Sequence, residues 1–261
     1  MRILSVSNQK GGVGKTTTSI NLAASLASAE RKTLLIDMDP QANAGSGLGL
    51  ARNSAEFSIY DVLSEERPLS DVILPTELAY LQLVPASQDL VGAEIELVTA
   101  PRREYRLRAA LEQLDRSYDY VILDCPPSLG LLTLNALTAC DSVVVPLQCE
   151  YFALEGLSAL LNTIDLVRGG PNPRIQLEGI VLTMFDRRTT LSAQVMKEVR
   201  SHFGDKVFES VIPRNVRLSE APSFGKPILL YDLESPGAQG YLALARELLG
   251  READPAAPQA A

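Results

Sequence analysis

Residues 8–18 constrain this chain more than any other stretch, because they place three glycines, Gly11, Gly12 and Gly14, between two lysines. The apolar residues 3–6 predict a strand before this stretch, and apolar residues at helical spacing between positions 20 and 27 predict a helix after it. A strand, a glycine turn and a helix N-terminus together form a cradle for phosphate, since glycines let backbone N–H groups converge on an anion without a clashing Cβ. The alternative, an ordinary turn beside a solvated lysine, leaves the position of the glycines directly after a strand unexplained.

The loop departs from the common phosphate-loop pattern G-x-x-x-x-G-K-[ST] at its first glycine, where this chain has Gln9. It reads K-G-G-V-G-K-T instead, with the second lysine, Lys10, ahead of the glycines. In a phosphate loop Lys15 reaches the β- and γ-phosphates of a nucleotide, and the Thr16 hydroxyl binds Mg²⁺. The predicted nucleotide-binding residues of the loop are Lys10, Gly11, Gly12, Val13, Gly14, Lys15, Thr16 and Thr17.

Two more apolar stretches end in aspartates. Residues 33–36 run into Asp37 and Asp39, and residues 120–123 run into Asp124. The carboxyl ends of parallel strands face the ligand crevice of an α/β sheet, so these carboxylates are predicted to lie near the bound nucleotide. An apolar strand that ends in an acid is the Walker B arrangement, and Asp124 is predicted to hold Mg²⁺ through water, with Asp37 near the same shell. For Asp39, the alternative to a position beside the nucleotide is that its carboxylate only caps the turn that follows.

Strand and helix patterns alternate along the chain and predict an α/β fold: a single-domain P-loop NTPase with a mostly parallel, twisted sheet and helices on both faces. The domain is predicted to span residues 1–250, and an Ala/Pro-rich tail, 251–261, is predicted to be disordered. Residues 42–49, rich in glycine and alanine, predict a flexible loop, and residues 151–167 predict a long amphipathic helix. A helix predicted over 102–114 carries four arginines, either as a solvated face or as a secondary contact with DNA or a partner.

Charge and cysteine content limit the function classes. The 261 residues carry a net charge of −8, which by itself argues against a nucleic-acid binder. The three cysteines have no C-x-x-C spacing and predict reduced, buried thiols rather than a disulfide framework or a zinc site. No signal peptide and no apolar run of membrane-spanning length is found, so the sequence predicts a cytoplasmic protein with no membrane partner.

The loop K-G-G-V-G-K-T resembles the deviant Walker A loop of the ParA/MinD family of P-loop ATPases, and the resemblance extends over residues 3 to about 249. It implies ATP and Mg²⁺ as cofactors and a homodimer in which Lys10 reaches across the interface to the phosphates of the other subunit's ATP. It also implies that Lys10, Lys15 and Asp39 are the catalytic residues, with Asp39 positioning the attacking water.

Residues 185–189 and 212–223 resemble the chromosomal ParA (Soj) branch of that family. This resemblance implies that Pro213 and Asn215 pack around adenine, and that Arg188 and Arg217 bind double-stranded DNA without sequence preference. Residues 183–231 contain eight basic and five acidic residues, a local net charge of +3, and a local positive face can bind phosphate backbone on an acidic protein. The basic residues show no interleaved aromatic platform, so contact with duplex phosphates is favoured over base stacking. The alternative is a pair of solvated arginines.

The function implied by the resemblance is an ATPase that dimerises with ATP, binds DNA on the nucleoid and drives chromosome or plasmid segregation. Hydrolysis would be slow intrinsically and accelerated by the basic N-terminal segment of a ParB-type centromere-binding protein. One alternative is a MinD-like membrane ATPase for division-site placement, which needs a C-terminal amphipathic helix; residues 251–261 contain Pro255 and Pro258 and almost no large apolar residue. Another is an iron-protein reductase, which would need Cys125 and Cys140 as cluster ligands. A nucleotide-dependent DNA scaffold with negligible turnover is the third.

Overall fold

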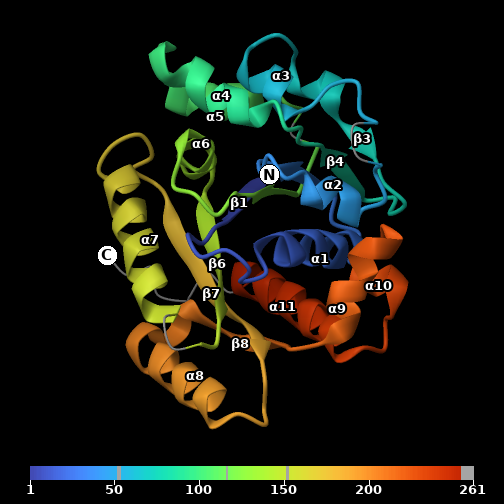
Figure 1. Ribbon diagram of the computed structural model, residues 1–261, viewed down its shortest axis with the longest axis vertical. Coiled ribbons are helices and arrows are strands. Elements are labelled where there is room, and N and C mark those ends of the chain that lie inside the picture. Colours follow the sequence, from blue (N-terminus) through green and yellow to red (C-terminus); the bar gives the residue numbers. More distant parts are fainter. Residues whose placement is uncertain (52–53, 116, 151–152, 254–261) are drawn as a thin grey trace.

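The computed structural model describes residues 1–51, 54–115, 117–150 and 153–253, which form an eight-stranded sheet with helices on both faces (Figure 1). Seven strands are parallel, and β3 at one edge pairs antiparallel to β4. The spatial order is β3-β4-β2-β5-β1-β6-β7-β8. The strands are β1 Arg2–Val6, β2 Thr33–Asp37, β3 Leu74–Pro75, β4 Leu81–Val84, β5 Tyr120–Asp124, β6 Ser142–Gln148, β7 Gln176–Phe185 and β8 Val207–Pro213.

Helices connect the parallel strands, as right-handed crossovers between parallel neighbours require. The α-helices are α1 Lys15–Ser28, α2 Asn43–Gly47, α3 Ile59–Leu63, α4 Leu90–Glu96, α5 Arg106–Glu112, α6 Leu131–Ala139, α7 Ala153–Arg168, α8 Thr190–Phe203, α9 Val216–Glu220, α10 Ile228–Tyr231 and α11 Pro236–Ala253. Short 3₁₀ turns are η1 Leu69–Val72, η2 Leu97–Thr99, η3 Arg103–Tyr105, η4 Gly204–Lys206 and η5 Ala221–Phe224.

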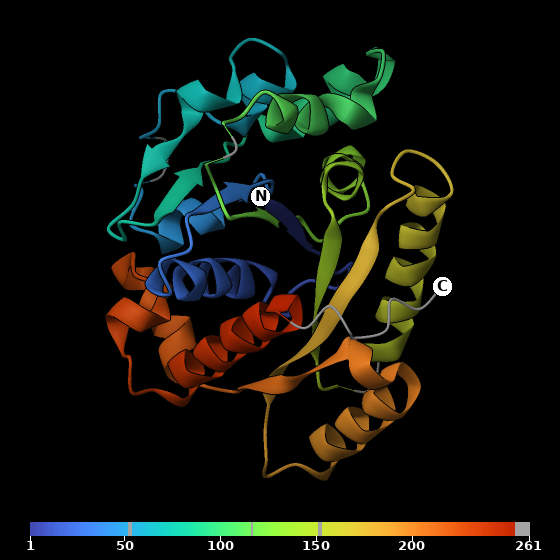
Figure 2. The same cartoon turned by 180° about the vertical axis from the view of Figure 1, so that it is seen from behind.

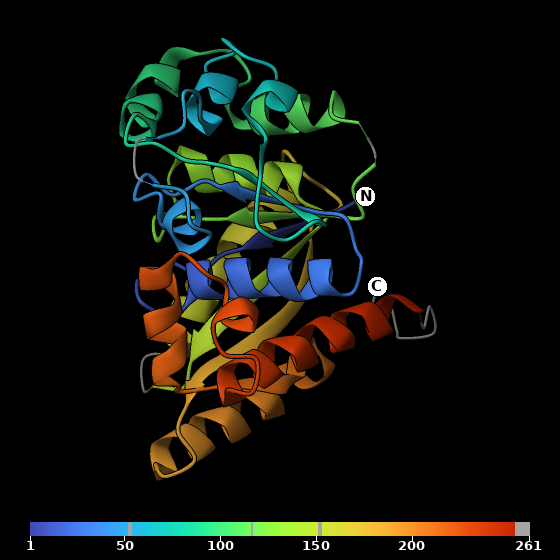
Figure 3. The ribbon, with the colours of Figure 1, turned by 90° about the vertical axis from the view of Figure 1, so that its right-hand side faces the viewer.

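The sheet separates two hydrophobic cores. Successive side chains of a strand point to opposite faces, so Leu34 and Ile36 of β2 enter one core while Leu35 enters the other. The first core is covered by α3 to α8, and the second by α1, α2, α10 and α11. Figure 3 shows α1 and α11 lying side by side on their face, and Figure 2 shows α11 passing next to β8. The predicted α/β architecture is therefore confirmed.

The central strand β1 lies between β5 and β6, and its carboxyl end is the start of the glycine loop. Val6 is in register with Asp124 of β5, and Asp124 is in register with Asp37 of β2. Parallel pairing therefore places the glycine loop and both strand-end carboxylates together at the carboxyl ends of the strands, as the sequence predicts. We call this side of the sheet its nucleotide edge.

The prediction of a flexible loop over 42–49 is wrong, because residues 43–47 form α2. The Asp37 carboxylate accepts a hydrogen bond from the Ala44 N–H at 2.9 Å and ties the start of this helix to β2. Ala44, Gly45 and Gly47 are buried, and a Cβ on Gly47 would overlap the Ile20 side chain of α1. Glycine is needed here for close packing of two helices, so the same composition that suggested flexibility serves a tight contact.

The helix predicted over 102–114 begins later than expected, at Arg106. Arg102 has a φ of 52° in the left-handed region, which breaks the helix, and η3 follows it. Arg106 pairs with Glu65, Arg108 with Glu112, Arg103 donates to the Val98 carbonyl and Arg102 lies over the Tyr105 ring. All four arginines therefore have partners within the chain.

Two other boundaries bear on the sequence predictions, and one of them falls partly on residues that are not described. The helix predicted over 151–167 is α7, and positions 151–152 lie outside the described residues. The domain extends past residue 250, because α11 runs to Ala253. Arg251 donates to the Glu178 carbonyl at 3.2 Å and lies 4.1 Å over the Phe208 ring, which fixes the end of this helix against β7 and β8. The rest of the predicted tail, 254–261, lies outside the described residues.

Within the described part of the chain, none of the helices combines the length and the apolar character that a bilayer crossing demands.

The contact between β7 and β8 gives a stability prediction with a matched control. A Cβ on Gly179 would lie 2.7 Å from the Phe208 ring and 3.1 Å from the Lys206 carbonyl, whereas a Cβ on Gly250 in α11 would meet nothing within 4 Å. Gly179→Ala should lower the free energy of unfolding by about 1–3 kcal/mol through overpacking. Gly250→Ala should raise it by about 0.5–1 kcal/mol, because alanine is the better helix former. Urea unfolding of both variants measures the difference, and equal effects would contradict the packing described for β7 and β8.

Candidate functional site

The glycine loop joins β1 to α1 and has the backbone geometry of a phosphate cradle. Gly12 and Gly14 adopt φ angles of 74° and 87°, in the region that glycine reaches without strain. Gly14 directly precedes α1, so the helix N-terminus opens toward the loop. Gly11 and Gly12 are exposed, while Val13 is buried and anchors the loop beneath them. The loop backbone thus has the conformation expected of an anion-binding turn before a helix N-terminus.

Two residues that the sequence analysis did not single out hold the loop in place. The buried side chain of Asn8 donates to the Pro146 carbonyl of β6 at 2.7 Å and accepts from the Lys10 N–H at 3.0 Å. Thr183 of β7 donates its hydroxyl to the Val13 carbonyl at 2.9 Å. These contacts join residues up to 170 positions apart, and no local pattern in the sequence could reveal them.

Lys15, the first residue of α1, lies almost fully buried beneath the loop. Its ammonium group donates to the Lys10 carbonyl at 3.0 Å. Burial lowers the pKa of Lys15, while the nearby carboxylates of Asp124 and Asp39 oppose that shift. The ammonium therefore occupies the cradle as a cation whose present partner, a loop carbonyl, can be exchanged for phosphate oxygen.

Asp124 at the end of β5 is fully buried and has an unsatisfied oxygen. One oxygen, Oδ1, accepts from the Ser19 hydroxyl at 2.8 Å, but Oδ2 has no hydrogen-bond partner among the described residues. Burial raises the pKa of Asp124 to about 7, and the nearby hydroxyls of Ser19 and Thr16 oppose that shift. A buried carboxylate oxygen without a partner beside a threonine hydroxyl fits a hard cation such as Mg²⁺, which takes one or two carboxylates and leaves its other positions to water and phosphate.

Asp37 is also fully buried, but its oxygens are both engaged. Oδ1 accepts from the Asp39 N–H at 3.0 Å and Oδ2 from the Ala44 N–H, so the carboxylate shapes the turn after β2. Burial raises the pKa of Asp37 well above its usual range, and the neighbouring Asp124 raises it further. These contacts give Asp37 a backbone-holding role; a role in the magnesium shell stays a prediction.

Asp39 lies close enough to Lys15 and Asp124 for its charge to raise the pKa of both groups. Its Oδ1 accepts from the Gln41 N–H at 2.9 Å, so it does cap the turn, as the plainer interpretation holds. Capping uses one of its two oxygens and leaves the carboxylate beside the cradle. Within the described residues, no three histidine, cysteine or acidic side chains form a metal-binding cluster.

Lys10 is paired within its own chain. Its ammonium lies 3.0 Å from Glu150 Oε2, and Gln148 donates to the other oxygen of Glu150. Both side chains of the ion pair are partly exposed. Glu150 follows β6 at the same sheet edge as the loop, but it carries no motif that would have identified it from the sequence.

A cavity of about 310 Å³ opens beside the loop and contains both residues predicted to contact adenine. Its residues come from the loop and α1, from the ends of β7 and β8, and from α9, η5 and α11: Gly14, Thr17, Thr183, Met184, Ile212, Pro213, Arg214, Asn215, Leu218, Ser219, Pro222 and Tyr241. Asn215 also caps α9 by accepting from the Arg217 N–H at 2.9 Å. The mixture of apolar and polar groups beside the phosphate cradle suits a planar base.

The two predicted DNA-contacting arginines lie outside this cavity and on separate elements. Arg188, between β7 and α8, makes a two-pronged contact with Asp186 at 2.9 and 2.8 Å. Arg217 of α9 pairs with Glu220 at 2.9 Å and Asp232 at 3.3 Å. Both guanidinium groups are solvent-exposed, so these pairs are screened by water and can be exchanged for phosphate.

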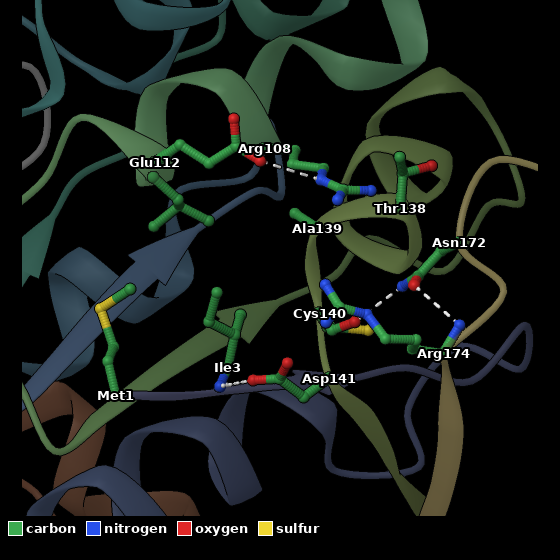
Figure 4. A pocket seen from close by; sticks show the side chains of 11 residues that line it. Met1, Ile3, Arg108, Glu112, Thr138, Ala139, Cys140, Asp141, Asn172 and Arg174 are labelled. Atoms are coloured by element: carbon green, nitrogen blue, oxygen red, sulfur yellow. Dashed lines mark hydrogen bonds and ion pairs between the residues drawn. The ribbon is translucent and has the colours of Figure 1, made fainter.

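Figure 4 shows another cavity, of about 220 Å³, at the amino ends of β1 and β6 and therefore at the opposite edge of the sheet. Its polar groups mostly pair with one another: Asp141 accepts from the Ile3 N–H at 2.8 Å, and Arg108 pairs with Glu112. Cys140 lies here, whereas Cys125 follows β5 at the nucleotide edge. The two cysteines are at opposite ends of parallel strands, which disfavours their acting together as cluster ligands.

Comparison with known proteins agrees with this geometry. Residues 1–177 match the family described as "AAA domain". The chromosome partitioning protein ParA of Myxococcus xanthus is 64% identical over 251 residues, which cover 96% of this chain and 89% of that protein. The sporulation initiation inhibitor protein Soj of Bacillus subtilis is 57% identical over 247 residues, covering 95% of this chain and 98% of that protein.

Solved structures show the same fold. A Mycobacterium smegmatis protein named cobyrinic acid a,c-diamide synthase, solved with ADP and magnesium, gives a TM-score of 0.86 at 39% identity over 97% of this chain and 96% of its own. The cell division ATPase MinD of Pyrococcus furiosus gives 0.76 at 25% identity, over 96% of this chain and 99% of its own. This chain belongs to the AAA domain family and, within it, to the ParA/Soj chromosome-partitioning proteins.

Proposed function

We propose that this chain is an ATPase that dimerises when it binds ATP, binds double-stranded DNA without sequence preference, and segregates chromosomes or plasmids with a ParB-type partner. The observation that carries the proposal is the second lysine, Lys10, on the open side of a phosphate cradle whose own chemistry Lys15 already supplies. The names of the relatives support chromosome partitioning as the process. The protein would act in the cytoplasm on the nucleoid.

Hydrolysis follows from the arrangement of the cradle. Bound Mg²⁺ would neutralise charge on the β- and γ-phosphate oxygens of ATP. Thr16 and Asp124 would hold it, since the unpaired Asp124 oxygen lies beside that hydroxyl. Lys15 would exchange the Lys10 carbonyl for phosphate oxygen, and Asp39 would orient the attacking water. Asp39 is a weak base, so intrinsic turnover would be slow and the basic segment of the partner would accelerate it.

The exposure of the loop supports ATP-dependent dimerisation. Two subunits that meet at this edge would each release Lys10 from Glu150 and insert it against the phosphates of the other subunit's ATP. The γ-phosphate would then link the two halves, and Lys10 would act catalytically in trans. Two weak DNA-binding faces, each with Arg188 and Arg217, would become one bivalent surface with higher effective affinity and no new type of contact.

The membrane alternative finds no support in the described residues. A MinD-like function needs an apolar amphipathic segment at the C-terminus, whereas α11 ends with Arg251 engaged against Glu178 and Phe208. Sedimentation with liposomes and ATP tests this alternative, and we expect no protein in the pellet.

DNA binding with ATP, with ADP and without nucleotide tests the proposed function directly. Wild-type protein should bind DNA only with ATP. Lys10→Ala should lose binding because no dimer forms, and Arg217→Ala should lose it at the DNA surface while still dimerising. Asp39→Ala should remain on DNA longer, because hydrolysis no longer releases it. Measuring ATP turnover with DNA and partner separates this function from a non-hydrolysing scaffold, for which turnover would stay negligible.

The buried Asp124 carboxylate gives a pH prediction for the nucleotide-free protein. Its folded-state pKa, about 7, is raised above the unfolded value, so the ionised form destabilises the fold fully above pH 7 and this cost disappears as pH falls. Asp124→Asn, which can still accept from Ser19, should therefore raise the melting temperature by several degrees at pH 8 and by about a third as much at pH 5, which lies between the unfolded and folded pKa values. The same variant should lose the extra stabilisation that Mg²⁺ and ATP give wild type. Equal shifts at both pH values would show that burial of the charge is not the cause.

The Lys10–Glu150 pair gives a prediction for dimerisation. Glu150→Gln keeps a partner for Gln148 but removes the charge that holds Lys10, so ATP-dependent dimers should form up to about fivefold more tightly, the range expected of an exposed ion pair. Sedimentation of the protein with a non-hydrolysable ATP analogue and Mg²⁺ measures the dimer constant. Glu112→Gln, which removes the exposed pair with Arg108 at the opposite sheet edge, is the control and should change nothing. Weaker dimers of Glu150→Gln would mean that Glu150 itself contacts the other subunit.

A further inference from the structure

Helix α4 and the adjoining turn η2 are apolar on two sides, and only one side is covered. Leu90, Ala93 and Leu97 are buried in the core beneath the helix. Val91, Ile95 and Val98, spaced at i, i+4 and i+7, form a stripe on the outer side, and their side chains are 58%, 74% and 53% exposed. Single exposed apolar residues are ordinary, but three on one helical stripe mark a surface that a partner covers.

The loop that follows β5 lies against α4. Leu129, in the loop after β5, is 40% exposed, and its neighbour Gly130 lies directly against α4. A Cβ on Gly130 would overlap the Glu94 carboxylate, so a larger residue at this position would push that side chain aside. The loop that touches α4 is the one that begins immediately after Asp124, so α4 and the candidate magnesium residue are joined by a short stretch of chain.

The charge around the stripe is negative. Residues 85–101 contain Asp89, Glu94 and Glu96 and no lysine, arginine or histidine, a local net charge of −3, and Arg102 and Arg103 follow directly. Glu94 Oε1 is buried and has no hydrogen-bond partner among the described residues. Glu96 accepts from the Tyr60 hydroxyl at 2.8 Å, and the field of the surrounding carboxylates helps to hold that phenol protonated. At the Val98 end of the stripe, the Arg103 side chain donates to the Val98 carbonyl and places one positive charge there.

We propose that this outer face of α4, consisting of Val91, Ile95 and Val98 with the carboxylates of Asp89 and Glu94, docks a basic amphipathic helix of a partner protein. Aliphatic residues at helical spacing would cover the stripe, and lysines or arginines beside them would meet the carboxylates. The inference rests on the proposed function in one respect: the occupant has the chemistry of the basic partner segment named there. It adds where that segment binds.

The charge of the face argues against the other occupants. A second copy presenting the same face would bring like charges together, since a two-fold contact pairs a surface with itself. DNA would be repelled by the same carboxylates. Figure 1 shows α4 beside α5 at the edge of the molecule formed by α3 to α5, away from α9 and α10 near which Arg217 lies. A partner on α4 would therefore leave the proposed DNA-binding surface free.

The contact between Glu94 and Gly130 explains how docking would act on hydrolysis. A basic side chain that pairs with Glu94 would draw its carboxylate toward the partner, and the loop after Asp124 would gain room to move. The position of Asp124 sets where a bound cation lies, so a small displacement of this loop changes the alignment of the reacting phosphate. The contact between Glu94 and Gly130 would thereby couple docking of the partner on α4 to stimulation of ATP hydrolysis.

Two exposed residues of nearly equal accessibility make the matched test. Ile95→Ser removes the centre of the stripe, and Leu166→Ser removes a side chain of α7 that is 76% exposed on another surface. The probe is a fluorescent peptide of the basic N-terminal segment of the ParB-type protein from the same genome. Ile95→Ser should weaken its binding about tenfold and abolish partner-stimulated ATP turnover, while Leu166→Ser should bind within twofold of wild type. Asp89→Asn should weaken binding several-fold and reduce its dependence on salt.

Basal turnover, ATP-dependent dimerisation and DNA binding should be unchanged in Ile95→Ser. Peptide binding and stimulation equal to wild type in this variant would overturn the proposal. Loss of the ATP-dependent dimer in Ile95→Ser would also overturn it and assign the face to a second copy. If wild-type protein binds the peptide through Ile95 but never dimerises with ATP, the docking surface stands and the proposed function fails.

Discussion

The burial of negative charge at the carboxyl edge of the sheet governs the rest of this structure. Parallel register brings Asp37 and Asp124 side by side, and both are fully enclosed. Burial and mutual repulsion raise the pKa of Asp37, and burial raises that of Asp124, so the site favours any arrangement that supplies positive charge. The ammonium of Lys15 supplies part of it, and a bound cation at the unpaired Asp124 oxygen would supply more. Burying these carboxylates therefore destabilises the fold, and binding of a cationic ligand would offset that destabilisation.

Local sequence could predict those parts of the site that depend on short-range geometry. The cradle follows from glycines between a strand and a helix, and Asp124 follows from the rule that parallel strands end at the ligand edge. Asn8, Thr183 and Glu150 could not be found this way, because their roles come from contacts with residues far away in the chain. Patterns predict which elements form, but hydrogen bonds between elements appear only when the sheet order is known.

The meaning of glycine and arginine also depended on neighbours that the sequence does not show. The glycines at 45 and 47 suggested a mobile loop, but Gly47 is required by the approach of Ile20 and lies in a buried helix. The arginines from 102 to 108 suggested a basic face, but each one is engaged with a carboxylate, a carbonyl or a ring of its own chain. The composition of a segment therefore allows several conformations and contacts, and its packing against the rest of the chain determines which one forms.

Gly11 is the glycine of the loop that packing among the described residues does not explain. Its φ is not positive, and a Cβ built on it meets nothing within 4 Å, so neither strain nor crowding among the described residues requires glycine there. Lys10, immediately before it, is held by Glu150, a partner at the protein's surface and not within the cradle. Open space above Gly11 and the partly exposed position of Lys10 leave this side of the loop accessible to a ligand or a second subunit. The part of the loop that departs from the common pattern is therefore the part that faces outward, where a second nucleotide-bound copy would meet it.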